Sequence, residues 1–330
     1  MNENIYDVTF LVASYNPEWY ALKRTLCSAL NQKYIKFQIV IADDGSKETF
    51  RNEVIKLFEE YEYKDYKFIE AEINKGTCLN IYNGLLSSEG EYIKTIGPGD
   101  CLYNESTLST WVDYAKNNSA DICFGDSVFF AKDATDLEIV ISKRRYPQNI
   151  DPYLKDNYCI KEGIYNYVLL GDVVWGSNLL TRRDVMITYM QRIIGKIKYA
   201  EDMIYRMMIA DGKKMTYFPK NVIWYEYGSG ISTSGDSKWR EIISNERKIS
   251  NKLIIEKNIY KGVGKLRFNF VMKCLSNKKS NWIKYLLYPN LIFYKIRKNM
   301  ININTTTDVN IEFLYQICTI KKQEEIQKCK

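Results

Sequence analysis

The feature that most constrains this chain is a regular alternation of strand-like and helical patterns through its first hundred residues. Short apolar runs lie at 8–13, 37–42, 66–71 and 91–96, and the segments between them carry apolar residues at helical spacing. Apolar strands that alternate with helices predict a parallel α/β sheet flanked by helices. Each run ends at polar or glycine-rich residues, and open α/β sheets bind ligands at the carboxyl ends of their strands.

The pattern changes after about residue 120. A tyrosine-rich, irregular stretch lies between Tyr146 and Tyr167, and the chain reads mostly as helix from about Ser237 onward. Between these points we expect strands at 122–130, 138–142, 173–180, 215–218 and 222–227, and a helix at 199–210. We therefore divide the chain into an α/β domain at 1–235 and a helical, basic region at 236–330.

The chain has 330 residues and no histidine. This excludes nucleophile systems that use histidine, histidine-ligated metals and an imidazole proton shuttle. General acid–base chemistry must then come from Asp, Glu, Lys, Tyr or Cys.

Cysteine usage and the N-terminal sequence indicate a cytoplasmic protein. The 8 cysteines are scattered and none is spaced as CxxC, which fits neither a zinc site nor a disulfide scaffold. The N-terminus has acidic residues before a short apolar run, unlike a signal peptide, and no uncharged apolar run is long enough to span a bilayer.

Two strand ends carry carboxylates that could bind a nucleotide. Asp43 and Asp44, in the sequence DDGS, could accept hydrogen bonds from a ribose or a base N–H, or lie near a metal. They could equally form a turn or cap a helix. In GPGD at 97–100, the glycines permit close backbone approach and Asp100 could ligate a cation that holds a diphosphate. The alternative is a tight turn with Asp100 as a helix cap.

Two later segments are candidates for catalysis or ligand binding. Glu201 and Asp202 begin a predicted helix, where a carboxylate is stabilised as an anion and could deprotonate a hydroxyl; simple capping charge is the alternative. The sequence WGSN at 175–178 precedes a pair of arginines. Tryptophan faces stack on sugar rings and arginines meet phosphates, whereas a core tryptophan beside a solvated basic pair is the alternative.

These motifs recur in a specific order: VASYN, FQIVIADDGS, NKG, GEYIKTIGPGD, GSNLLTRRDV, YAEDMIYRMMIADG and TYFPKNVIWYEYGSGIST. In this order the chain resembles the family 2 glycosyltransferases, from about Val8 to Ser232. The resemblance implies the GT-A fold, a mixed sheet that binds a nucleotide sugar. It also implies inverting transfer from a nucleotide donor, with UDP expected, to a hydroxyl of a glycan or lipid-linked acceptor in surface polysaccharide or similar glycan synthesis.

The resemblance also assigns site residues. Asp43 and Asp44 match the acidic pair that holds the uracil and ribose, and Asp202, with Glu201, matches the general base. The implied nucleotide-sugar site is formed by Ser14, Tyr15, Asn16, Asp43, Asp44, Asn74, Lys75, Gly76, Gly99 and Asp100. The residues implied to face the donor sugar or the acceptor are Trp175, Gly176, Ser177 and Asn178.

One motif departs from the family pattern. After the fourth strand the family usually has Asp-x-Asp-Asp, and here these positions are Gly97, Pro98, Gly99 and Asp100. Both carboxylates of the usual DXD motif are absent, and only Asp100 remains to ligate a metal. Since Mg²⁺ often uses one or two carboxylates with waters and phosphate oxygens, we expect Mg²⁺ or Mn²⁺ to be used but held weakly before the donor binds.

The expected mechanism is a single displacement. Asp202 removes the proton of the acceptor hydroxyl, which attacks the anomeric carbon opposite the nucleotide, so that an α-linked donor gives a β-linked product. The charge of the departing diphosphate would be neutralised by the cation at Asp100 and by Lys75.

The positive charge of the chain is concentrated near its C-terminal end. The formal net charge is +7, and residues 261–300 contain ten Lys or Arg, interleaved with aromatics, and no Asp or Glu. Such a segment could bind either nucleic acid or an anionic membrane. Without a nucleic-acid motif we favour peripheral contact with the inner face of a membrane and expect no nucleic-acid partner; a solvated basic face of packed helices is the third alternative.

Two other functions remain open at this point. A non-catalytic GT-A subunit that binds sugar nucleotides is suggested by the loss of the two DXD carboxylates. A nucleotidyltransferase would share the nucleotide-binding sheet but would need a glycine-rich basic loop near the first strand, which VASYNPEW does not offer.

Overall fold

The computed structural model describes residues 5–131, 139–140, 146–154, 159–227, 237–277, 280–300, 309 and 311–318. Its described strands form one nine-stranded sheet in the order β3-β2-β1-β4-β8-β6-β9-β5, with β7 paired to β6. The strands are β1 (Tyr6–Ser14), β2 (Phe37–Asp43), β3 (Tyr66–Glu70), β4 (Gly90–Ile96), β5 (Cys101–Leu102), β6 (Ile122–Ala131), β7 (Ile139–Val140), β8 (Leu179–Arg182) and β9 (Met215–Tyr227).

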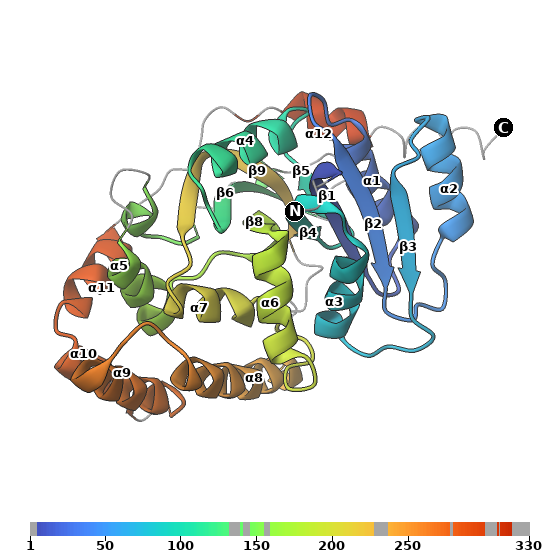
Figure 1. The fold of residues 1–330 in the computed structure, drawn as a ribbon. Coiled ribbons are helices and arrows are strands. Elements are labelled where there is room, and N and C mark those ends of the chain that lie inside the picture. Colours follow the sequence, from blue (N-terminus) through green and yellow to red (C-terminus); the bar gives the residue numbers. More distant parts are fainter. Residues whose placement is uncertain are drawn as a thin grey trace.

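Helices flank this sheet and continue beyond it (Figure 1). The α-helices are α1 (Trp19–Leu30), α2 (Arg51–Glu60), α3 (Thr77–Ser87), α4 (Thr107–Asn117), α5 (Ile160–Gly163), α6 (Arg183–Ile193), α7 (Met203–Ala210), α8 (Ser237–Glu256), α9 (Gly262–Leu275), α10 (Ile283–Leu287), α11 (Leu291–Met300) and α12 (Ile311–Cys318). The other helical segments are the 3₁₀ turns η1 (Asp151–Tyr153) and η4 (Gly176–Asn178) and the π-helix η3 (Ile164–Leu170).

The first half of the sheet is parallel, as the strand–helix alternation predicts. β1 pairs in parallel with both β2 and β4, and β2 pairs in parallel with β3. The second half is mixed, because β8 runs antiparallel to β4 and β6 while β6 runs parallel to β9. The predicted mixed α/β fold with a helical C-terminal region is thus confirmed.

Alternate residues of the strands supply two separate hydrophobic cores. Leu11 and Val40 face a core shared with α3, α6 and α7, whereas Phe10 and Ile39 face a core that includes Leu26 of α1 and residues of α2, α4 and α12. Because both faces of the central strands are buried, the middle parts of β1 and β2 consist mostly of apolar residues.

A glycine brings α3 against the sheet. A Cβ at Gly84 would lie 2.5 Å from Cδ1 of Leu11, so only glycine permits this close packing. One turn earlier on the same face of this helix, the Asn80 amide donates to the carbonyl of Ala42 at 2.8 Å. The N-terminus of α3, at Thr77, is therefore held beside the carboxyl ends of β1 and β2.

Three expected elements differ from the structure. The strand expected at 173–180 is wrong for its first part, since the chain makes the turn η4 before β8 begins at Leu179. The strands expected at 215–218 and 222–227 form one strand, β9, whose register against β6 is interrupted near Asp126. The helix expected at 199–210 begins only at Met203, because the preceding residues form a loop.

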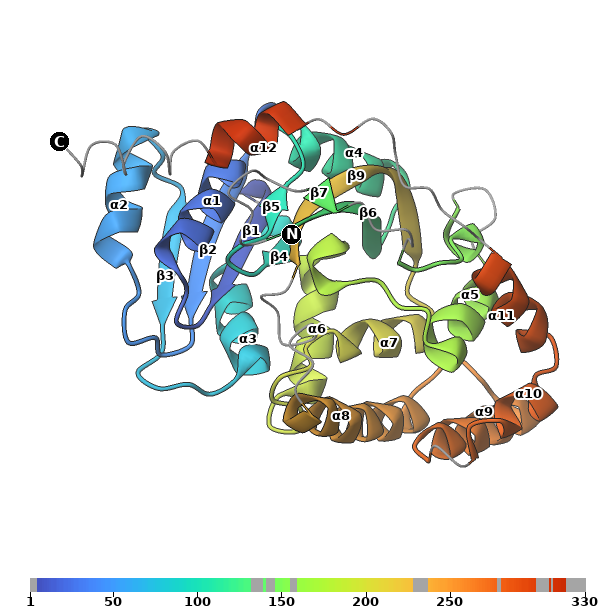
Figure 2. The same ribbon diagram turned by 180° about the vertical axis from the view of Figure 1, so that it is seen from behind.

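The C-terminal helices form the lower edge of the molecule in Figure 1. Helices α8, α9 and α10 follow one another along this edge, and α12 returns to pack on α1 at the opposite side (Figures 1 and 2). The boundary expected near residue 235 falls within residues 228–236, which lie outside the described residues. No helix in the described ranges combines the length and the apolar character that crossing a bilayer requires.

Candidate active site

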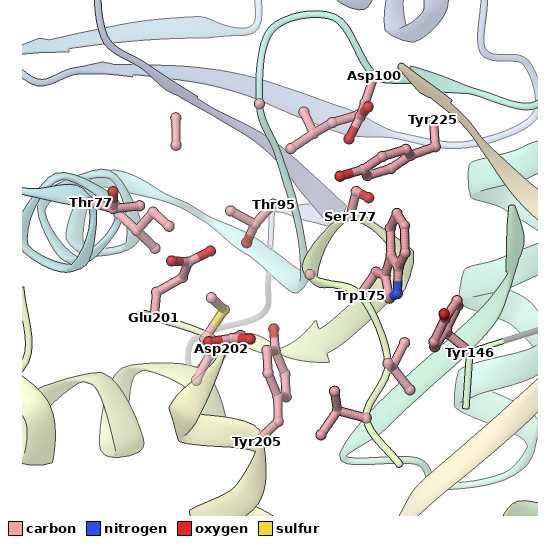
Figure 3. Close-up of a pocket in the computed structure, with 18 residues that line it drawn as sticks. Thr77, Thr95, Asp100, Tyr146, Trp175, Ser177, Glu201, Asp202, Tyr205 and Tyr225 are labelled. Carbon is pink, nitrogen blue, oxygen red and sulfur yellow. The ribbon is translucent and has the colours of Figure 1, made fainter. Parts of the chain in front are cut away.

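A pocket of about 520 Å³ opens where the strand ends meet the start of α7 (Figure 3). Strands β1 and β4, helices α3, α6 and α7, and the loop before β8 all contribute to its wall. The lining residues are Ala13, Thr77, Ile81, Thr95, Ile96, Gly97, Asp100, Tyr146, Val173, Val174, Trp175, Gly176, Ser177, Met186, Glu201, Asp202, Tyr205 and Tyr225. The pocket thus brings together three predicted carboxylates, with Asp100 on one side and Glu201 and Asp202 on the other.

Glu201 and Asp202 are adjacent, partly buried carboxyls whose environments differ. Burial, and next the charge of Asp202, raise the pKa of Glu201 to about 8. Burial also raises the pKa of Asp202, but Arg206 and Arg247 oppose this shift. Because two neighbouring carboxyls in such a site do not both ionise readily, the pair retains one proton near neutral pH. The arginines favour Asp202 as the ionised member, which is the state a general base requires.

A buried carboxylate from α8 fixes the loop that carries this pair. Glu246 is 7% exposed and accepts the backbone N–H groups of Lys198, Tyr199 and Ala200. The carbonyl of Lys198 in turn accepts the N–H of Cys78, at the start of α3. The candidate base is therefore held between α8 and α3 by charge-assisted and backbone hydrogen bonds.

An aromatic wall forms another side of the pocket. Trp175 packs edge-on against Tyr225 with ring centroids 4.5 Å apart, and it also contacts Tyr146 and Phe129 at 5.1 and 5.0 Å. Gly176 lies opposite Glu201, since a Cβ on this glycine would be 3.8 Å from Oε1 of Glu201. Trp175, Gly176 and Ser177 thus line the same pocket as the carboxyl pair.

Asn178 lies apart from this wall. Its side chain is 3% exposed, and its amide donates to the carbonyl of Gly125 at 2.9 Å. Asn178 therefore holds the turn before β8 against β6, and it is not among the described residues that line the pocket.

The two acidic residues at the end of β2 are buried and bind backbone groups. The Asp43 carboxylate accepts the N–H and the hydroxyl of Ser46 at 2.7 and 2.6 Å. The Asp44 carboxylate accepts the N–H groups of Lys75 and Gly76, both at 2.8 Å. These bonds use part of the capacity of each carboxylate and tie the loops after β2 and β3 together.

The segment after β1 belongs to the same network. Ser14 is buried and its carbonyl accepts the N–H of Asp44 at 2.9 Å. The N–H of Asn16 donates to the Ser46 hydroxyl at 2.7 Å, and its side-chain oxygen accepts the N–H of Lys47. Tyr15 is 53% exposed beside them. This polar rim adjoins the pocket through Ala13, which precedes Ser14 and lines it.

Asn74, Lys75 and Gly76 complete the rim before α3. Gly76 has a φ of 99°, and a Cβ there would lie 2.3 Å from the Lys198 side chain, so that position requires glycine. Asn74 is partly buried, whereas the Lys75 side chain is exposed. Thr77, the next residue, lines the pocket. Of the ten residues predicted to bind the nucleotide sugar, Asp100 is among the described lining residues and the other nine are not.

The segment that replaces the DXD motif has two unlike glycines. Gly99 has a φ of 111°, and a Cβ there would meet the Glu226 carboxylate, which forms a salt bridge with Arg24. No atom of the described residues lies within 4 Å of a Cβ built at Gly97, which lines the pocket. A carboxylate could therefore be accommodated at position 97 but not at position 99.

Asp100 is the pocket carboxylate best placed to hold a cation. One of its oxygens accepts the N–H of Glu226 at 2.9 Å. Burial raises its pKa to about 7, against the effect of that hydrogen bond and of the buried Lys94. Among the described residues no three His, Cys, Asp or Glu side chains are grouped to hold a metal. This donor set fits a magnesium-type ion that completes its shell with diphosphate oxygens and waters, since Mg²⁺ is commonly held in that way.

Several lining residues were not predicted from the sequence. Thr95 follows Ile93 on one face of β4, so strand periodicity could have indicated it. Tyr146 and Tyr225 come from distant segments, and only the folded chain brings them to Trp175. Glu246 lies in a helical pattern that carried no motif.

The sheet order and the pocket define the class: solved structures of the GT-A type share this fold along nearly the whole chain. TarS 1-349 from S. aureus, in complex with UDP-GlcNAc, superposes with a TM-score of 0.56 at 14% identity over 96% of this chain and 92% of that one. The mannosyltransferase PcManGT from Pyrobaculum calidifontis, in complex with GDP-Man and Mn²⁺, gives 0.56 at 12% identity over 97% and 88%.

The family follows from the sequence comparison. Residues 9–170 match the family model described as glycosyl transferase family 2, which confirms the resemblance for this part of the chain. A poly-beta-1,6-N-acetyl-D-glucosamine synthase of Staphylococcus epidermidis is 28% identical over 35% of this chain and 27% of its own length. Glycosyltransferase GlyA of Streptococcus pneumoniae is 25% identical over 70% of this chain and 32% of its own length. The matches span less than a third of either relative.

Proposed function

We propose that this chain is an inverting glycosyltransferase that moves a sugar from a UDP donor to a hydroxyl group of a glycan or lipid-linked acceptor. The observation that carries the proposal is the carboxyl pair Glu201–Asp202, which faces Asp100 across one pocket. The polar rim formed by the ends of β1 and β2 and the loop before α3 is the proposed place of the nucleotide. Solved relatives of this fold that hold UDP-GlcNAc or GDP-Man support a nucleotide-sugar donor.

In this proposal Asp202 accepts the proton of the acceptor hydroxyl. The hydroxyl oxygen forms a bond to the anomeric carbon while the bond from that carbon to the diphosphate breaks, and UDP leaves. Glu201 stays protonated, so that its neutral carboxyl does not repel the charge on Asp202. Trp175 and Tyr225 present ring surfaces on which a sugar can stack.

The leaving diphosphate needs positive charge beside Asp100. A divalent cation held there would neutralise the developing charge of the leaving group. The chain itself contributes Lys75, which is exposed at the rim. The Mn²⁺ complex of a relative with this fold supports the use of a metal.

We further propose that residues 261–300 contact an anionic membrane surface. Helices α9, α10 and α11 expose large apolar side chains next to their basic residues: Val263, Leu266, Phe270, Trp282, Leu286, Ile292, Phe293 and Ile296 are 46–81% exposed. A segment with an exposed apolar surface, ten Lys or Arg and no Asp or Glu suits a bilayer of anionic lipids, although Lys284 is buried and Arg297 and Lys298 pair with Asp151 and Asp172. The protein would then act at the inner face of a membrane, with residues 1–235 as the catalytic domain.

The activity is tested by incubating the purified chain with a panel of UDP-sugars and Mn²⁺ and following UDP release. We expect one UDP-sugar to be consumed, and proton NMR of the first sugar released or transferred to show the β anomer. Binding of UDP without turnover of any donor, with or without a crude glycan fraction, would favour a non-catalytic nucleotide-binding subunit. A first product with the α configuration would contradict a single displacement.

A further inference from the structure

A second pocket, of about 260 Å³, lies on the other side of α7. It is enclosed by η3, α7, α8, the end of α9 and the start of α10, and it shares no lining residue with the first pocket. Its lining residues are Val168, Leu169, Leu170, Arg206, Ser244, Arg247, Lys248, Asn251, Leu275, Ser276, Asn281 and Lys284.

Four of the lining residues are cations, and none of the described lining residues is a carboxylate. Arg206 and Lys284 are 3% and 6% exposed and form the buried part of the pocket. Arg247 and Lys248 are exposed at its mouth. Fully buried Lys and Arg side chains are rare unless they are paired with an anion.

The cations retain unused hydrogen-bond donors. One Nη of Arg206 donates to Asn251 at 2.8 Å, but its buried Nε has no acceptor. Lys284 donates to the carbonyl of Leu169 at 2.9 Å, which leaves two N–H groups of its ammonium without an acceptor among the described residues. Within the same ranges Arg247 makes no hydrogen bond.

The charges repel one another. Burial, and next Arg247, lower the pKa of Arg206 to about 9, and burial followed by Arg247 and two more lysines lowers the pKa of Lys284 to about 8. The attraction that Asp202 exerts on Arg206 and Arg247 comes from the side of the first pocket. An anion in the second pocket would relieve this repulsion and satisfy the free donors.

We propose that this second pocket binds a phosphoryl group. Two guanidinium groups and two ammonium groups around one cavity suit a multiply charged tetrahedral oxyanion, because arginine meets phosphate with paired N–H donors. The walls of Leu169, Leu170 and Leu275 leave apolar room for the organic part of a phosphate ester. Asn281 at the pocket adjoins Trp282, which belongs to the exposed apolar surface of α9–α11. The phosphoryl group therefore comes either from a lipid headgroup or from free phosphate.

The site is tested by isothermal titration of the full chain with inorganic phosphate and, in a second arm, with dihexanoyl phosphatidic acid. The variants are Arg247→Gln and Lys284→Gln, and the control is Lys252→Gln, an exposed lysine of α8 outside the pocket. We expect each pocket variant to weaken binding by about tenfold or more, because each removes a charge-assisted contact, and Lys252→Gln to bind like the wild type.

The two arms also identify the source. Tighter binding of dihexanoyl phosphatidic acid than of phosphate assigns the site to a lipid phosphate, and the reverse order assigns it to free phosphate. Arg247 is exposed, so its variant should fold even if Lys284→Gln does not. Absence of binding at millimolar phosphate and lipid, or equal affinity in the wild type and a folded Arg247→Gln, would overturn the proposal, since any binding would then lie elsewhere.

Discussion

Gly97 and Gly99 occupy the positions that the resemblance assigns to the DXD carboxylates, and the structure distinguishes them. We expect Gly97→Asp to fold normally and to raise the affinity for Mn²⁺ by about tenfold in the presence of UDP, because it adds a carboxylate to Asp100 in open space. The matched variant Gly99→Asp should lower the melting temperature without such a gain, since its side chain would meet Glu226 from a strained backbone. Titration of Mn²⁺ and thermal melts provide both readouts. Equal stability and equal Mn²⁺ affinity of the two variants would contradict this view.

Glu201 provides a pH-dependent prediction. Its pKa is raised from 4.5 to about 8, so the folded state binds a proton that the unfolded chain releases in this range. The stability that the neutral carboxyl contributes is complete below about pH 4.5 and is lost as the pH rises to about 8. We expect Glu201→Gln, which stays neutral, to melt near the wild-type temperature at pH 5 and clearly above it at pH 8.5. A difference in melting temperature that is the same at both pH values would show that Glu201 is not protonated in the folded protein.

At the scale of elements, α8 positions the candidate base through Glu246. We expect Glu246→Ala to destabilise the protein by about 3 kcal/mol, because one buried and two partly buried N–H groups lose a charged acceptor. It should also lower kcat more than it weakens UDP binding, since the loop that Glu246 holds carries Glu201 and Asp202 and contacts the proposed rim through Lys198 and Gly76. The control is Glu241→Gln, an exposed residue of the same helix. A Glu246→Ala variant with wild-type kcat and stability would show that α8 does not position the candidate base through Glu246.

The elements also show what sequence could and could not predict. Strand–helix alternation located β1 to β4, because buried parallel strands and amphipathic helices each leave a distinct local pattern. The region around Trp175 could not be predicted in the same way, since η4 is set by a hydrogen bond from Asn178 to β6. Likewise Asp43 and Asp44 were expected at the nucleotide, and their bonds to Ser46 and Gly76 could be seen only in the fold. Residue type indicated the site, but tertiary contacts determine what each side chain does.

At the scale of the whole molecule, charge and exposed apolar surface coincide in residues 261–300. We expect the chain to sediment with vesicles of anionic lipid at low salt and to be released at high salt, because surface electrostatic attraction is screened. The double variant Leu286→Ser/Phe293→Ser should weaken this binding at least about tenfold, given roughly 1.5–3 kcal/mol for each large apolar side chain that is buried. The control is Tyr34→Ser, which alters an exposed aromatic residue far in sequence from residues 261–300. A wild-type chain that stays in the supernatant at low salt would rule out the membrane contact.

The proposed single-displacement sugar transfer depends on Asp202 as its base. The most direct measurement compares UDP release and UDP affinity in Asp202→Asn, with Glu201→Gln as the neighbouring control. We expect Asp202→Asn to lose about 100-fold or more in turnover while it binds UDP like the wild type, because general base catalysis contributes on that order. Glu201→Gln should keep turnover within about tenfold, since it mimics the protonated carboxyl. An Asp202→Asn variant that retains more than about a tenth of wild-type turnover would contradict the account.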